Sequence, residues 1–219
     1  MDNRQTGMGM NILALETSQA HASLALSANG VISVQESWVA ERNHDAYLFP
    51  ALRKALETLG NEKLNLILVG AGPGSYGGVR VSLAAATGMA QVSGASVAAI
   101  GSWNQLAESG AAVVSDARRN SWTVRKDNGC IEVLTDEALL ALQRNGIRLL
   151  STEAPGVLQK RGIVPDKENL TPTAEGLIRT WEGLTETDRK TALNTPPEPI
   201  YVRPPHITKQ LHKPWEIRH

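Results

Sequence analysis

The sequence contains a single cysteine, Cys130, and has no net charge of either sign. One thiol cannot form an internal disulfide, and a cysteine-rich zinc site is excluded. Because 22 basic side chains are balanced by 22 acidic ones, the chain is not a strongly basic protein of the kind that encloses nucleic acid. No apolar run reaches the roughly 18 residues that a membrane span needs. The remaining composition, 42% hydrophobic in 219 residues, predicts a folded protein of a reducing compartment, most simply the cytoplasm.

Charge and proline are distributed unevenly along the chain. Residues 1–100 hold 6 Lys/Arg and 7 Asp/Glu, whereas residues 101–219 hold 16 and 15. Eight of the 11 prolines lie after residue 160. We therefore expect a leader without regular structure over residues 1–9, a front lobe over 10–101, a reduced second lobe over 102–202 and a proline-rich basic tail over 203–219.

The front lobe alternates short apolar runs with helical spacing. Asn29-Gly30 is a strong hairpin signal between two alternating runs, and Asn43 is a candidate N-cap. Three hairpin-connected strands followed by helix, strand, helix, strand predict a mixed α/β sheet with covering helices. The predicted strands span residues 10–16, 22–27, 31–36, 64–69 and 97–100, and the predicted helices span 43–59 and 79–92.

The second lobe has a weaker pattern of the same kind. Strands are expected at residues 111–115, 121–125 and 130–134, and helices at 136–145 and 171–181. The periodicity leaves open whether this lobe duplicates the first. Its last segment, the tail over 203–219, cannot form a regular helix across its prolines.

The most specific segment is the glycine-rich loop Gly72-Pro-Gly-Ser-Tyr-Gly-Gly-Val-Arg80, between a predicted strand and a predicted helix. Glycines there allow a sharp turn and leave amide groups at a helix start, where an anion can bind. The loop lacks the spacing of a P-loop and its lysine. A tight structural turn and a phosphate cradle are both consistent with the sequence, and the turn is favoured.

The chain resembles a known family in five segments: Ile12-Leu-Ala-Leu-Glu-Thr-Ser18, the loop Gly72–Arg80, Ala98-Ala-Ile-Gly101, Asp116-Ala-Arg-Arg119 and Pro199-Ile-Tyr-Val-Arg203. Together they resemble the bacterial tRNA threonylcarbamoyladenosine biosynthesis family TsaB, also called YeaZ, most closely over residues 10–101. The resemblance implies an α/β fold of the actin-like ATPase (ribonuclease H-like) type. It has two lobes, with a mixed five-stranded sheet in the N-terminal lobe and a reduced C-terminal lobe.

The chain departs from the family pattern at two positions. Glu16 stands where members usually carry aspartate, and Gly77 stands where they usually carry threonine. The superfamily's ATP users wrap a triphosphate with acidic-glycine hairpins from both lobes. Here Asp116 is followed by no glycine until Gly129. The second half of a nucleotide clamp is therefore missing, and an independent ATPase is disfavoured.

The sequence predicts no metal site, no cofactor and no catalytic residue. The catalytic relative TsaD holds its metal with two histidines four residues apart on one helix, and the matching stretch 102–108 has no histidine. His44 is expected at a helix start, and Cys130 is expected to be a packed thiol. The only candidates for a vestigial binding site are Glu16, Gly72, Gly74 and Ser75, with Glu16 more simply a hydrogen-bonded turn residue.

The two front-lobe helices are the candidate partner surface. The helix over 79–92 is rich in small residues nearly all round, which suits either close packing on the sheet or a docking helix. The resemblance implies pairing with a TsaD-like catalytic subunit through these helices, and a homodimer when alone. The candidate interface residues are Leu48, Leu52, Val79, Leu83, Ala86 and Met89.

The resemblance implies a non-catalytic subunit of the complex that transfers a threonylcarbamoyl group to N6 of the anticodon-adjacent adenosine of tRNA. ATP and metal would belong to the partner subunits, including a TsaE-like ATPase, and tRNA would bind within the complex. Arg118, Arg119, Arg125 and Lys126 form a local basic cluster, either a solvated surface or a tRNA contact. Two alternatives remain: a kinase or ATP hydrolase using Glu16 and the loop at 72–78, or a metallo-glycopeptidase.

Overall fold

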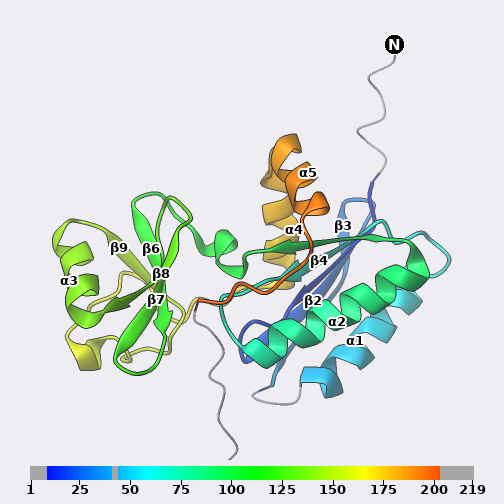
Figure 1. The fold of residues 1–219 in the computed structure, drawn as a ribbon. Helices are drawn as coiled ribbons and strands as arrows, with labels where there is room; N and C mark the ends of the chain where they lie inside the picture. Colours follow the sequence, from blue (N-terminus) through cyan, green and yellow to red (C-terminus); the bar gives the residue numbers. More distant parts are fainter. Residues whose placement is uncertain (1–8, 41–43, 203–219) are drawn as a thin grey trace, which may run out of the picture.

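A computed structural model describes residues 9–40 and 44–202, and it contains two mixed β-sheets that lie side by side (Figure 1). In the first sheet, β1 (Ile12–Glu16) is the central strand. It pairs antiparallel with β2 (His21–Ala28) and parallel with β4 (Leu66–Gly70). The edge strands are β3 (Val31–Val39) and β5 (Ser96–Ile100). All residues of β1 and β4 are buried, which their apolar runs predict for every position except the charged Glu16 at the end of β1.

The hairpin between β2 and β3 forms where it was predicted. Asn29 and Gly30 both adopt left-handed backbone angles, with φ of 52° and 81°. A two-residue turn with both central φ values positive matches the right-handed twist of the strands that it joins. This pairing fixes the side of the sheet on which each β2 residue lies.

Helices cover both faces of the first sheet. On one face lie α1 (His44–Leu59) and α2 (Tyr76–Ser93), which enclose a core that includes Leu15, Ile67 and Ala86. On the other face lies α4 (Ala174–Gly183), whose Trp181 packs with Leu68. The next helix, α5 (Glu186–Asn194), contacts β5. Residues 174–194, placed in the second lobe by the sequence analysis, therefore pack on the first sheet.

The second sheet repeats the connections of the first. Its order is β8 (Ile131–Thr135), β7 (Ser121–Arg125), β6 (Ala111–Asp116) and β9 (Arg148–Ser151). As in the first sheet, two antiparallel pairings precede a helix, α3 (Asp136–Arg144), and a parallel pairing. The two sheets thus share one topology over four strands, and within the described residues the position next to β9 holds only an isolated parallel bridge between Leu150 and Lys167. Such a shared topology is what an internal duplication, the possibility that the sequence left open, would produce.

Three features differ from the predicted elements. The helix expected from residue 79 begins at Tyr76, because Ser75 caps it by accepting a hydrogen bond from the Gly78 amide. Strand β9 and helix α5 were not predicted: β9 has only four residues, and α5 has no buried residue to create a period. Two short 3₁₀ helices, η1 (Ser102–Leu106) and η2 (Gln159–Arg161), complete the described elements.

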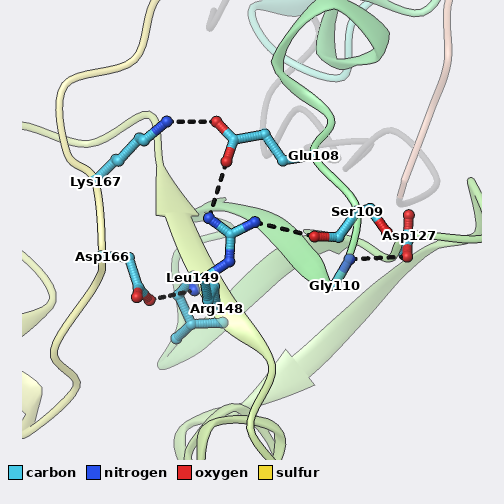
Figure 2. Close-up of polar contacts among 8 residues, drawn as sticks. All are labelled: Glu108, Ser109, Gly110, Asp127, Arg148, Leu149, Asp166 and Lys167. Atoms are coloured by element: carbon cyan, nitrogen blue, oxygen red, sulfur yellow. Dashed lines mark hydrogen bonds and ion pairs between the residues drawn. The ribbon is translucent and has the colours of Figure 1, made fainter.

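An ion-pair cluster holds the segment between the lobes against the second sheet (Figure 2). The carboxylate of Glu108 accepts hydrogen bonds from Arg148, at the start of β9, and from Lys167. Lys167 and then Arg148 lower the pKa of the Glu108 carboxyl. Beside it, Asp127 accepts from the Gly110 amide at 3.0 Å. These contacts fix the direction in which the chain enters β6.

Several expectations lie outside the described residues. They are residues 1–8 of the leader predicted over 1–9, the cap at Asn43 and the tail over 203–219. The side chain of His44 is also not described. Within residues 9–40 and 44–202, no helix is both long and apolar enough to cross a membrane.

Candidate functional site

A cleft of about 960 Å³ lies between the two lobes. Its walls come from loops that follow parallel strands of both sheets, where such strands usually present ligand sites. From the first lobe come the segments after β1 and β4, and from the second lobe those after β6 and β9. The segment after α5, drawn in orange to red in Figure 1, supplies Pro199–Val202 to the same cleft.

The glycine-rich loop forms a tight turn packed on the end of β1. The Ser75 amide donates to the Ser18 carbonyl oxygen at 2.6 Å, and the Gly72 amide donates to the Ser102 hydroxyl at 3.0 Å. A Cβ on Gly74 would lie only 2.0 Å from the Ser18 carbonyl oxygen, and Gly72 has a φ of +88°. These two glycines are therefore needed by the turn. Because the Gly72, Ser75 and Gly78 amides all bond within the protein, the geometry supports the turn rather than the phosphate cradle.

Glu16 is enclosed at the end of β1 and does not line the cleft. Its Oε1 accepts a hydrogen bond from the Ser18 amide at 2.8 Å, which confirms the interpretation as a turn residue. Burial raises the pKa of its carboxyl, and hydrogen bonds with Ser18 and Ser102 offset part of that rise. The Gly70 backbone packs so closely that a Cβ there would lie 2.1 Å from Oε2. A catalytic acid would need access to substrate, and Glu16 has none in this arrangement.

The second-lobe wall of the cleft carries both charge signs. Asp116 ends β6, and its Oδ1 accepts from the Arg118 amide at 2.7 Å. Arg118, Arg119 and Asn120 all adopt positive φ in the turn that follows. Glu153 accepts from the Ser115 hydroxyl and from the Asp116 amide. In the described part of the chain, no three His, Cys, Asp or Glu residues are grouped so that they could hold a metal ion.

The basic cluster of the sequence is divided in space. Arg118 and Arg119 precede β7, whereas Arg125 ends it, so the two pairs lie at opposite ends of the strand. Lys126 forms an ion pair with Glu132, and the Arg125 Nε donates to Asn104 at 3.1 Å. The four residues do not form one continuous surface. Cys130 is exposed, so the prediction of a packed thiol was wrong.

A second concave surface, the α1–α2 groove, has a volume of about 610 Å³. Of the predicted interface residues, all but Met89 are buried in the front-lobe core: Leu48, Leu52, Val79, Leu83 and Ala86. Leu52 and Met89 also line the groove. The exposed apolar side chains there are Phe49 and Leu56, 57% and 43% exposed, which the predicted interface did not include. Helical spacing identified the buried side of α1, and Leu56 lies at the edge of that side while Phe49 lies outside it.

Known proteins that are similar to this chain identify its family. The family model described as TsaD, tRNA N6-adenosine threonylcarbamoyltransferase, matches residues 34–150, which is more than half of the chain. A TsaB protein of Buchnera aphidicola is 35% identical over 81 residues, covering 36% of each chain. One of Bacillus subtilis is 30% identical over 103 residues, covering 46% of this chain and 45% of the relative. The chain belongs to the TsaB/YeaZ family.

The TsaB/YeaZ assignment agrees with the fold. A crystal structure of an uncharacterized Pseudomonas aeruginosa protein with similarity to peptidase YeaZ superposes with a TM-score of 0.68 at 24% identity. It covers 89% of this chain and is itself covered completely. The predicted actin-like fold with two lobes is thereby confirmed. The aligned segments span less than half of the curated TsaB relatives.

Gly77 is one of the two positions at which the chain departs from the TsaB/YeaZ pattern, and it lies in an open part of the structure. Gly77, where the family usually carries threonine, lies in the first turn of α2, and a Cβ at this position would meet no atom within 4 Å. The first side-chain atom of a threonine would therefore meet no neighbour there. Gly77 is therefore not required by packing, in contrast to Gly74.

Proposed function

We propose that this chain is a non-catalytic subunit of the assembly that transfers a threonylcarbamoyl group to N6 of the anticodon-adjacent adenosine of tRNA. In this proposal it binds a TsaD-like catalytic subunit through the α1–α2 groove. Membership of the TsaB/YeaZ family supports a role in the biosynthesis of threonylcarbamoyladenosine in tRNA. The observation that carries the docking role is the groove itself, in which Phe49 and Leu56 stand exposed beside Met89.

The groove has the composition of a protein interface. Covering exposed apolar side chains removes them from water and contributes about 25 cal/mol for each Å² buried. Ala85 on α2 lets a partner helix approach closely, and Met89 can adapt its shape. Arg53 and Glu57 form an exposed i,i+4 pair at the edge. An apolar centre with a charged edge is the usual anatomy of such a surface.

The cleft supports the non-catalytic part of the proposal. Glu16 is enclosed, and the loop amides of Gly72, Ser75 and Gly78 are bonded within the protein. The chemistry is accordingly assigned to other subunits: ATP and metal to the TsaD-like enzyme and to a TsaE-like ATPase, with tRNA bound across the complex. No cofactor is assigned to this chain.

Co-elution with the TsaD-like subunit of the same organism tests the docking role. We expect Phe49→Asp to weaken the complex about tenfold or more, because a charge would be buried against an apolar partner. The control is Val164→Asp, which alters another exposed hydrophobic residue, outside the groove, and should co-elute like the native chain. Equal co-elution of both variants would contradict the docking role.

The isolated chain provides a second readout of the same groove. If two copies pair through it when the catalytic subunit is absent, Phe49→Asp should shift the native dimer to a monomer on size-exclusion chromatography. ATP turnover or metal-dependent peptide cleavage by the purified chain would instead support the enzymatic alternatives.

A further inference from the structure

Two exposed tyrosines meet at the rim of the cleft between the lobes. Tyr76 begins α2, and Tyr201 lies in the segment after α5. Their ring centroids are 5.4 Å apart with an interplanar angle of 33°. The Arg80 guanidinium lies 5.0 Å from the centre of the Tyr76 ring and donates to its hydroxyl at 2.8 Å. Three planar groups are therefore gathered at one edge of the cleft.

The tyrosine pair is not explained by packing alone. Tyr76 and Tyr201 are 48% and 50% exposed, and neither belongs to a hydrophobic core of the described chain. The segment that carries Tyr201 is already attached by the Ile200 amide, which donates to the Ala71 carbonyl oxygen at 2.8 Å. Aromatic surface is thus held in place and left in contact with water. Two exposed rings held in this way can stack on a planar ligand.

The charges around the rim indicate which planar ligand fits. Arg80 is an exposed cation against Tyr76, and Arg118 is an exposed cation that lines the cleft together with Asp116 and Glu153. The carboxylates repel a phosphate from the interior but can accept hydrogen bonds from the amino groups of a base. A nucleotide within a nucleic-acid chain can place its base in the cleft, near the carboxylates. Its phosphates then lie outside the cleft, near the arginines.

The sequence that follows Tyr201 has the charge that an RNA backbone attracts. It contains Arg203, Lys209, Lys213 and Arg218 against a single acid, Glu216. Proteins that bind unpaired RNA combine aromatic stacking surfaces with cations that follow the backbone. The aromatic pair and the basic sequence adjoin one another in this chain.

We propose that Tyr76 and Tyr201, with Arg80, form a stacking surface for an unpaired base of an RNA, held at the cleft rim with its backbone outside. This inference rests on the proposed function, in which the RNA is the tRNA that the complex modifies. It adds a direct RNA contact made by this subunit itself. The contact is separate from the docking surface, because the cleft and the α1–α2 groove share no lining residue.

Binding of a fluorescently labelled anticodon stem–loop RNA, by the full chain and by its complex with the TsaD-like subunit, tests the proposal. We expect Tyr201→Ala and Tyr76→Ala each to weaken binding by roughly tenfold, the loss of one stacked ring. Tyr201→Trp, which keeps a stacking face, should bind like the native chain. The matched control is Tyr47→Ala, which removes an equally exposed tyrosine from α1 and should leave RNA binding unchanged.

Each other outcome overturns the proposal. Unchanged affinity in both alanine variants would show that the rings do not contact RNA, and so would a failure of both the chain and the complex to bind it. If Tyr201→Ala disrupted co-elution with the TsaD-like subunit but not RNA binding, the rim would be a protein interface. Failure of the proposed function would give a different result. The native chain would then not co-elute with the TsaD-like subunit, although the stem–loop would still bind to the chain.

Discussion

Glu16 carries a carboxyl group whose pKa burial raises above the ordinary 4.5. An acid with a raised pKa in the folded state stabilises that state fully below its unfolded pKa, and the contribution is lost as the pH rises through the folded pKa. Glu16→Gln keeps the shape without the charge. We therefore expect it to increase the free energy of unfolding at pH 7, with a gain that shrinks as the pH falls from the raised folded pKa toward 4.5 and is lost below that value.

Urea titration across this pH range measures the effect. The control is Glu182→Gln, which removes an exposed carboxyl on α4 and should change the stability little. A Glu16→Gln variant less stable than the native chain at pH 7 would show that the charge is needed, and would reopen a functional role for it.

The second prediction concerns the close packing of Gly74 in its turn. A Cβ at Gly74 would overlap the Ser18 carbonyl oxygen, whereas one at Gly77 would meet nothing within 4 Å. Gly74→Ala should therefore lower the free energy of unfolding by about 1–3 kcal/mol. Gly77→Ala should leave it unchanged or raise it by up to about 1 kcal/mol, because alanine favours the helix. Equal effects in urea titration would contradict this account of the loop.

Helix α2 separates core residues from surface residues within one turn. Ala86 is completely buried, while Ala84 on the same helix is exposed. We expect Ala86→Asp to lower the free energy of unfolding by more than about 4 kcal/mol, because it buries an unpaired charge. Ala84→Asp should stay within about 0.5 kcal/mol of the native chain. Thermal unfolding of the two variants compares them directly, and similar melting temperatures would contradict the assignment of Ala86 to the core.

The elements of the first sheet could be predicted because each has a local signal. Asn29-Gly30 fixes the hairpin, and the apolar run of β4 is long enough to identify a buried strand. Strand β9 and helix α5 have no such signal. The α1–α2 groove was only partly predictable: spacing identified both helices but selected their buried sides, so Phe49 and Leu56 were missed as interface residues.

The assembly of the lobes depends on contacts that are distant in the sequence. The Ala174 amide donates to the Ser23 hydroxyl across 151 residues, which brings α4 back to the first sheet. A change in composition near residue 100 cannot reveal such a return. The cleft likewise combines segments from both lobes with Pro199–Val202 near the end of the described chain. Its tyrosine pair could be found only after the fold was known.

Hydrogen–deuterium exchange on the chain, with and without the TsaD-like subunit, tests the central claim most directly. Amides that a partner covers exchange more slowly. The account predicts slower exchange over α1 and α2, around Phe49, Leu56 and Met89, and unchanged exchange over the second sheet. Slower exchange over β6–β9, with α1 and α2 unaffected, would contradict it.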